Sequence, residues 1–337
     1  MELKELKEQF LLQYIMSSDN TKLKYSIELD LFFNICGIYT YDNLKSFNGQ
    51  NLTLFYNYSK EKKWNPNTIN QRLATAKLFT KWCVKKGFIK SDFLEEIKKI
   101  RTVNETRFTP SNEECVQLLK YIREHTSKKR LYVMTRLLLN SGLRRMEICN
   151  LKLNDLDKEN STLKVYGKGK KIVNQPIPPA VMSDIIDYIN TERIETMKKY
   201  TELGGKDLGY VFVSNIGDSL KIKNKNLENG NKINEISFYN QIKTHAKNSG
   251  MENGDKFDVH SLRRAIGTQI YEETGDIMTA KEFLRHTNVT TTEKCYINYD
   301  KKKVSKSINE VFEKNNKVEN NDEYELFLTL QKKYGNI

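Results

Sequence analysis

The sequence predicts a two-domain protein that is mainly α-helical and carries one small β-sheet in its second half. The chain has 337 residues, a length that suits about two domains, each with its own core. Apolar residues recur at helical spacing through most of the chain, whereas strand-like runs are confined to residues 163–177 and 210–214. The helical pattern stops near residues 101–108, where we expect a linker.

The first domain, residues 1–100, is expected to be helical throughout. Its clearest helix follows Asn65 and Pro66, with Thr68 as the predicted N-cap and Gly87 as the residue that ends it. One face is apolar: Ile69, Leu73, Ala76, Phe79 and Val84. The other face is polar and cationic: Asn70, Arg72, Lys77 and Lys81. An ordinary amphipathic helix has the same pattern, but in a basic protein this face, with Thr68 at its start, is a candidate for the DNA major groove.

The second domain is expected to span residues 109–315, with a tail or helix at 316–337. Thr109 can cap its first helix, with Pro110 at the first helical position. A buried helix over residues 131–140 is expected to end at Gly142. Residues 163–165 and 172–177 predict a hairpin whose tip, residues 167–171, is rich in glycine and lysine. Further helices are expected at residues 181–200, 236–247, 261–273 and 279–284.

The charge balance indicates a polyanionic partner. The chain has 56 Lys and Arg against 43 Asp and Glu, a formal net charge of +13, and nucleic acid is the commonest partner of such proteins. A solvated lysine-rich surface is the alternative explanation. No apolar run approaches the roughly 18 residues of a membrane span. The five scattered cysteines and four histidines disfavour a metal site and indicate free thiols in a reducing cytosol.

Three separated segments supply side chains that suit attack on a phosphodiester. Arg144 and Arg263 are planar cations that can each grip two phosphate oxygens, and His260, one helical turn before Arg263, can move a proton. Lys168 at the hairpin tip can protonate a leaving oxygen, and Tyr296 can act as a covalent nucleophile. Glu147 is placed to orient Arg144. Each piece alone has a plainer explanation, such as a surface salt bridge or a solvated turn.

In their order along the chain, these segments resemble the tyrosine recombinase (phage integrase) family over nearly the whole length. The family's catalytic domain has a Gly-Leu-Arg-x-x-Glu segment, a Gly-Lys-Gly hairpin, a His-x-Leu-Arg helix, a later histidine and a C-terminal tyrosine. The matching residues here are Gly142-Leu143-Arg144 with Glu147, Gly167-Lys168-Gly169, His260-Ser261-Leu262-Arg263, His286 and Tyr296. The helix from Thr68 to Gly87 is similar to the family's core-binding domain.

The resemblance implies a fold with a helical N-terminal core-binding domain and a mixed α/β catalytic domain. It also implies that Tyr296 attacks the scissile phosphate and forms a 3′-phosphotyrosyl link. Arg144 and Arg263 would stabilise the transition state, and Lys168 would protonate the 5′-oxygen. No metal is expected to be needed, because the surrounding cations supply the positive charge, and no ATP, because the covalent link retains the energy for religation.

The remaining candidate site residues have supporting roles by the same resemblance. His260 would help with the tyrosine proton, His286 would hydrogen-bond the phosphate, and Glu147 would hold the site together. The neighbouring Arg145 and Arg264 are expected to contact the DNA backbone.

Two departures from the family pattern concern the last segment. Arg285 stands before the second histidine, where the family usually has glycine. Cys295 occupies the usual tyrosine position, and Tyr296 follows one residue later, a spacing that resembles integrases of conjugative transposons. Tyr299 is the competing nucleophile.

The expected function is site-specific DNA recombination through a Holliday junction, by a two-domain Xer-like, Cre-like or conjugative-transposon-like integrase. The expected partners are double-stranded DNA with inverted-repeat core sites and three further copies of the chain, which would complete a homo-tetramer. The expected location is the cytoplasm, in association with the nucleoid when the protein is bound to DNA. An accessory DNA-bending factor is a further candidate partner. A helix at 304–312 or 324–333 would pack on a neighbouring subunit. The alternatives are a DNA-binding relative without cleavage and an enzyme like a type IB topoisomerase or telomere resolvase.

Overall fold

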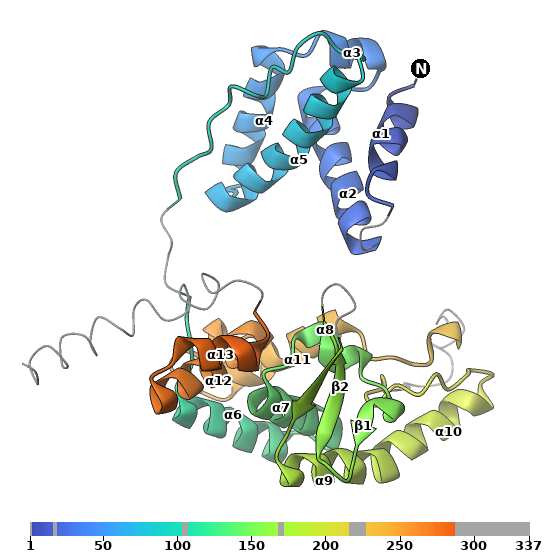
Figure 1. The fold of residues 1–337 in the computed structure, drawn as a ribbon, viewed down its shortest axis with the longest axis vertical. Helices are drawn as coiled ribbons and strands as arrows, with labels where there is room; N and C mark the ends of the chain where they lie inside the picture. Colours follow the sequence, from blue (N-terminus) through green and yellow to red (C-terminus); the bar gives the residue numbers. More distant parts are fainter. Residues whose placement is uncertain (1, 16–18, 103–106, 168–171, 216–226, 287–337) are drawn as a thin grey trace, which may run out of the picture. The chain divides into compact units, whose positions relative to one another are not determined.

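The computed structural model describes residues 2–15, 19–102, 107–167, 172–215 and 227–286 (Figure 1). The chain divides into two compact units, Met1–Glu105 and Thr106–Ile337. Helices dominate the described residues, and their named strands form a single three-stranded sheet. The predicted fold class is therefore confirmed. Among the described residues, no helix is both long enough and apolar enough to cross a lipid bilayer.

Unit 1 is a helical unit built around an aromatic core. Its described helices are α1 (Leu3–Leu12), α2 (Asp19–Cys36), α3 (Tyr41–Lys45), α4 (Gly49–Glu61) and α5 (Pro66–Lys85). Phe10 of α1 packs edge-on against Phe79 and Trp82 of α5, with ring centroids 5.4 and 5.8 Å apart. Phe33 of α2 reaches the same Phe79 ring at 5.3 Å. Edge-to-face packing of this kind fixes how α1 and α2 lie against α5.

The expected start of α5 is wrong, whereas its expected end is confirmed. Asn65, not Thr68, is the N-cap: its side chain accepts from the N–H of Asn67 at 2.8 Å, and Pro66 occupies the first helical position. The helix starts earlier than expected because the fixed φ of proline suits that position. At the other end Gly87 has φ 75°, and Phe88 N–H donates to Cys83 O at 2.9 Å. Gly87 therefore ends the helix as predicted.

Unit 2 packs helices around α7. Its described helices are α6 (Asn112–His125), α7 (Lys129–Ser141), α8 (Arg145–Asn150), α9 (Pro179–Tyr188), α10 (Ile194–Glu202), α11 (Glu235–Asn248), α12 (Val259–Thr274) and α13 (Ile277–Leu284). Helices α6, α9, α11 and α12 all contact α7, which explains why Met134, Leu137 and Leu138 have no exposed surface. Helix α13 packs on α12 at one end of the unit (Figure 1).

The sheet is an antiparallel meander of β1 (Leu156–Asp157), β2 (Thr162–Tyr166) and β3 (Ile172–Pro176). Tyr166 pairs with Ile172, so β2 and β3 form the predicted hairpin. Its tip, residues 168–171, lies outside the described residues. Leu163 and Val165 are buried while their neighbours face solvent, the alternation expected of a strand with one covered face.

Two local expectations in unit 2 are wrong. Ser111, not Thr109, caps α6, because its hydroxyl accepts from Glu114 N–H at 3.2 Å while the Glu114 carboxylate accepts from Ser111 N–H at 2.8 Å. Residues 210–214 form only isolated bridges, Lys152 with Tyr210 and Val213 with Lys232, rather than a strand. The helix expected over 181–200 is present: α9, a π-helical turn at Ile189–Arg193 and α10 follow one another without a break.

Candidate active site

The first part of the candidate site begins where α7 ends, at Gly142. Its backbone is left-handed, with φ 56° and ψ 28°, and its N–H donates to Leu138 O at 3.0 Å. A Cβ at this position would lie 2.8 Å from Cε1 of Phe283 and 2.9 Å from Cδ2 of Leu284. Glycine suits both the turn and the close approach of α13. The end of α7 and the end of α13 are thereby brought together.

Two residues after this turn, Arg144 pairs with Glu147 at the start of α8. The N–H of Arg144 donates to Oε2 of Glu147 at 2.7 Å, and its Nη1 donates to Oε1 at 2.8 Å. The side chain of Glu147 is only 8% exposed, whereas that of Arg144 is 38% exposed. The carboxylate thus holds the arginine by two bonds while the guanidinium keeps a face toward solvent, where a phosphate can approach.

The charge of Glu147 is stabilised by these contacts. Burial by itself raises the pKa of the carboxyl, but the hydrogen bond from Arg144 N–H and the charges of Arg285 and Arg144 outweigh burial. The pKa of Glu147 is therefore lowered from its ordinary value of 4.5. At neutral pH this residue is a buried anion among cations.

The second part of the site is the first turn of α12, which carries His260 and Arg263. Asp258 caps this helix: its carboxylate accepts from Ser261 N–H at 2.6 Å, and Ser261 Oγ accepts from Asp258 N–H at 2.9 Å. Free N–H groups at this helix start would attract a phosphate, but a carboxylate of the protein already occupies that position. His260 is exposed, while Arg263 is buried.

Arg263 joins the two halves of the site. Its Nη1 donates to the carbonyl oxygen of Gly142 and its Nη2 to that of Leu284. The side chain is 6% exposed, so these bonds form away from water, where an unpaired carbonyl would be costly. Arg263 thus connects α12 with the end of α7 and the end of α13.

The last turn of α13 accepts hydrogen bonds from both predicted catalytic arginines. Leu284 O accepts from Arg263, and the next carbonyl, Arg285 O, accepts from Nη2 of Arg144 at 2.9 Å. His286 follows directly, and its N–H donates to Lys281 O at 3.1 Å. The structure therefore brings Arg144, Arg263 and His286 together around one helix end.

Both site histidines are held toward their neutral forms. Burial, followed by the charges of Arg263, Arg144 and Arg285, lowers the pKa of His286 from 6.5 to about 4. The pKa of His260, which keeps exposed surface, is also lowered, first by partial burial and then by Arg145, Arg264 and Arg263, although Asp258 opposes the shift. A neutral imidazole can accept a proton, as the expected role of His260 requires.

Arg285 and Gln175 belong to this cluster although neither was predicted as a site residue. The Nη2 of Arg285 donates to Oε2 of Glu147 at 2.9 Å, and its Nη1 donates to Oε1 of the buried Gln175 on β3. The signal for Arg285 is present in the sequence, as the arginine that departs from the family pattern noted above. Gln175 has no such signal, because its contact depends on how the hairpin packs.

Three predicted residues lie outside the described residues: Lys168, Tyr296 and the competitor Tyr299. The hairpin that carries Lys168 is described up to Gly167 on one strand and from Ile172 on the other. The two helices proposed for subunit contacts also lie outside the described residues.

Arg145 and Arg264, predicted to contact DNA, each have a partner in the protein. The guanidinium of Arg145 lies 5.5 Å from the ring centroid of Tyr239 on α11. Nη2 of Arg264 donates to Phe108 O at 2.6 Å, which ties α12 to the segment that leads into α6. Both side chains are half-buried. Contact with DNA remains a prediction for them.

The polar face of α5 is partly engaged with unit 1 itself. Asn70 pairs with both backbone groups of Ile100, at 2.8 and 2.9 Å, and Lys77 donates to Ile97 O. The guanidinium of Arg72 lies 3.6 Å from the centroid of the Trp64 ring, a cation–π contact. Lys81 is exposed. Thr68 is half-buried in the first turn.

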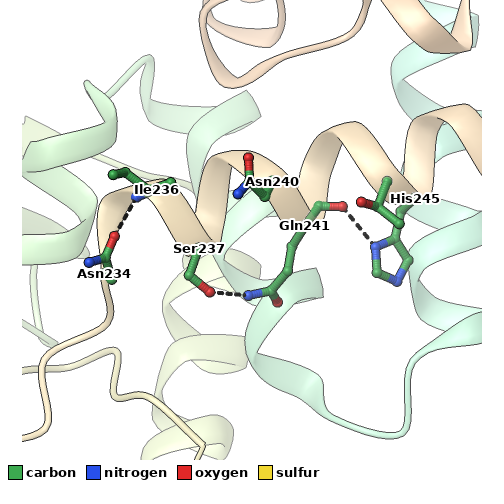
Figure 2. Close-up of a pocket in the computed structure, with 7 residues that line it drawn as sticks. Asn234, Ile236, Ser237, Asn240, Gln241 and His245 are labelled. Atoms are coloured by element: carbon green, nitrogen blue, oxygen red, sulfur yellow. Dashed lines mark hydrogen bonds between the residues drawn. The ribbon is translucent and has the colours of Figure 1, made fainter. Parts of the chain in front are cut away.

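A shallow pocket follows the polar face of α11 (Figure 2). Its volume is about 530 Å³, and its lining includes Asn234, Ser237, Gln241 and His245. Asn234 caps the helix through Ile236 N–H at 2.7 Å, and Gln241 donates to Ser237 Oγ at 2.9 Å. The lining also includes Ile236, and more of its surface is apolar than polar. None of the candidate site residues contributes to this lining. No group of three or more His, Cys, Asp or Glu side chains suited to a metal occurs among the described residues.

The sequence of this chain is similar to that of known recombinases. Residues 110–303 match the Phage integrase family. A tyrosine recombinase XerC of Thermodesulfovibrio yellowstonii is 25% identical over 260 residues, which cover 76% of this chain and 78% of the relative. A tyrosine recombinase XerA of Pyrococcus furiosus is 29% identical over 213 residues, covering 62% and 65%.

The fold is similar to that of integrases solved with DNA. The Tn1549 transposon integrase in complex with a circular intermediate DNA has a TM-score of 0.65 at 16% identity, covering 88% of this chain and 95% of that one. A lambda integrase dimer bound to a COC′ core site has a TM-score of 0.62 at 13% identity, covering 88% and 77%. The family match spans more than half of the chain and includes the whole arginine cluster. The chain belongs to the phage integrase family and is a site-specific tyrosine recombinase.

Proposed function

We propose that this protein cleaves and rejoins DNA strands through a covalent link between Tyr296 and a 3′-phosphate. The observation that supports this most strongly is the arrangement at the end of α13. There, Arg144 and Arg263 donate to consecutive carbonyls, directly before His286 and shortly before Tyr296 in the sequence. Cations from distant parts of the chain thus converge on the segment that leads to the nucleophile.

In the proposed first step, the phenolic oxygen of Tyr296 attacks the scissile phosphorus. A bond forms between that oxygen and phosphorus, and the bond to the 5′-oxygen of the next nucleotide breaks. The phenol proton passes to His260, and Lys168 gives a proton to the leaving 5′-oxygen. Religation reverses these transfers with the 5′-hydroxyl of a new strand, so the number of phosphodiester bonds is unchanged.

The positive charge of the site addresses two chemical problems. A phenol with a pKa near 10 is mostly protonated at neutral pH, and the phosphate carries a negative charge that repels a nucleophile. In this proposal the exposed face of Arg144 binds a phosphate oxygen, while the buried Arg263 holds the surrounding backbone and adds its charge at short range. His286, held neutral, would donate a hydrogen bond to the phosphate.

For recombination, four copies would act on two duplexes through a Holliday junction. A lambda integrase tetramer bound to a Holliday junction has a fold similar to that of this chain, with a TM-score of 0.60 at 15% identity. The net charge of +13 supports association with DNA. Core sites in inverted repeat would follow from the symmetry of paired subunits.

The test is capture of the covalent intermediate. DNA ends trapped on the protein in cells would first be mapped, and the site found would be rebuilt as a duplex with a nick beside the scissile phosphate. The wild-type chain should form a protein–DNA adduct that survives denaturation, because the short released fragment diffuses away. Absence of an adduct would favour the alternative of a relative that binds DNA without cleaving it. Adducts without Holliday junctions would indicate a topoisomerase-like or resolvase-like enzyme.

A further inference from the structure

Arg285, at the C-cap of α13, contacts strand β3 and the segment 142–147 and lies directly before His286. We propose that it is a positioning residue that locks these segments together for strand cleavage. This inference rests on the proposed function, because it assigns Arg285 a part in the same site. Arg285 is not proposed to touch the DNA. Its side chain is 10% exposed and is engaged with protein groups.

The contacts of Arg285 join its own segment, the end of α13, to two others, strand β3 and the segment 142–147. Through Nη1 it binds the side chain of Gln175 on β3, the strand that follows the hairpin tip with Lys168. Through Nη2 it binds Glu147 at 2.9 Å and, more weakly, Gly142 O at 3.4 Å. Its own carbonyl accepts from Arg144 at 2.9 Å, and His286 is the next residue. One residue therefore spans the hairpin, the α8 turn and the end of α13.

The backbone of Arg285 is an independent observation. It adopts the left-handed region, with φ 54° and ψ 44°, at the C-cap of α13. Among the described residues that are not glycine, only Lys63, Ser161 and Asn231 share a positive φ. A side chain in this region strains the backbone, and glycine would relieve the strain. An arginine at this position is explained when the contacts of its side chain stabilise the site by more free energy than the backbone strain costs.

The charge arrangement indicates what that contribution is. Glu147 is 8% exposed and is shared between Arg144 and Arg285, one oxygen pairing with each side chain. Without Arg285, the whole charge of this buried carboxylate would compensate Arg144. The field that Arg144 directs at a phosphate would then weaken, because buried charges are poorly screened. Arg285 therefore both positions Glu147 and preserves the positive potential of the site.

The experiment compares Arg285→Gly, Arg285→Lys, Gln175→Met and the Arg285→Gly/Gln175→Met double variant with the wild-type chain. Cleavage is followed in a single turnover on the nicked duplex, and DNA affinity is measured separately. Lys63→Gly is the matched control, because it relieves a similar left-handed strain at an exposed lysine of unit 1. His286 is titrated by NMR in the same proteins, its resonance assigned with His286→Gln.

We expect Arg285→Gly to lower the cleavage rate about 100-fold, the scale of a small misplacement of reacting groups, with DNA affinity changed less than about threefold. Arg285→Lys keeps the charge without the planar fork and should recover part of the rate. The double variant should be no slower than Arg285→Gly, because Arg285→Gly already removes the contact with Gln175 that Gln175→Met breaks. Removal of a neighbouring positive charge should also raise the pKa of His286, whereas Lys63→Gly should change neither readout.

Two results would overturn the inference: cleavage by Arg285→Gly at the wild-type rate, or effects of Arg285→Gly and Gln175→Met that multiply in the double variant. A wild-type chain that forms no adduct would instead overturn the proposed function. In that case the NMR titration of His286 still tests whether Arg285 acts on the site. A pKa of His286 that is unchanged in Arg285→Gly would show that it does not. Should Arg285→Gly fail to fold, Arg285→Lys and Gln175→Met carry the same comparison.

Discussion

The guanidinium of Arg263 donates a hydrogen bond to the carbonyl oxygen of Gly142, a residue 121 positions earlier in the chain. Its other terminal nitrogen donates to Leu284 O, so a single buried side chain holds the ends of α7 and α13 together. This arginine is therefore part of the framework of the site as well as a source of its charge.

Substitution of Arg263 should affect stability and chemistry together. Arg263→Ala leaves two carbonyls without these donors in a buried setting, which should lower the free energy of unfolding by about 1–3 kcal/mol for each. Cleavage should fall by about 10²- to 10³-fold in addition. Denaturant unfolding and single-turnover cleavage measure the two effects. Arg263→Lys, which keeps the charge, should retain more stability, and equal losses in both variants would contradict this account.

Gly142 should tolerate alanine less well than a comparable glycine. Gly275 ends α12 with φ 67°, and a Cβ added there would have no atom within 4 Å, so Gly275→Ala should cost only the left-handed strain of about 1 kcal/mol. Gly142→Ala has a similar φ of 56° but adds contacts with Phe283 and Leu284. Overpacking should cost about 1–3 kcal/mol more. Thermal unfolding of the two variants compares these costs directly, and equal shifts in Tm would show that α13 moves aside freely.

The stability of unit 2 should decrease in mild acid because of His286. Its pKa is 6.5 ordinarily and about 4 in the folded chain, so below pH 6.5 the unfolded state binds a proton that the folded state does not. The free energy of unfolding should therefore fall as the pH decreases from 6.5 to about 4, by at most about 3 kcal/mol. The actual decrease should be smaller, because His286 is only half-buried and solvent screens its charge. Urea unfolding across this range measures the slope. His286→Gln should flatten it, and an unchanged slope would assign the effect to other groups.

Tyr296→Phe should bind DNA as well as the wild-type chain and form no covalent adduct, because the substitution removes only the oxygen that we propose as the nucleophile. Tyr299→Phe is the matched control, three residues away and with the same chemical change. Adduct formation on the nicked duplex and a gel-shift measurement separate chemistry from binding. Retained cleavage in Tyr296→Phe, with loss in Tyr299→Phe, would reassign the nucleophile.

Lys81 should contribute to DNA binding through a phosphate. Loss of one such contact in Lys81→Ala should reduce the slope of log affinity against log salt by about 0.9. Lys199→Ala removes the same charge from an exposed position on α10, which carries none of the candidate site residues, and should leave the slope unchanged. Asn70→Ala should instead destabilise unit 1, because Asn70 pairs with the backbone of Ile100. A salt titration of affinity for each variant decides among these expectations.

Some of the site could be predicted from the sequence because its signals are local. The glycine after a buried helix, the three-residue spacing of Arg144 and Glu147 and the spacing of His260 and Arg263 depend on helix geometry alone. The hairpin could be predicted for the same reason, since alternation and turn residues act within a few positions. The predictions of Thr68 and Thr109 as caps are wrong because several polar residues compete near a helix start, and the backbone selects among them.

By itself, the amino-acid sequence determined the family and the mainly helical fold class with one small sheet, and it supplied the candidate residues for phosphate chemistry. Only the tertiary structure decided that Arg263 is buried, that Asp258 already occupies the start of α12, and that Arg285 shares Glu147 with Arg144. The physical reason is distance along the chain. Helical periodicity and capping are short-range effects, whereas the partner of a guanidinium is set by the packing of segments that are far apart in the sequence.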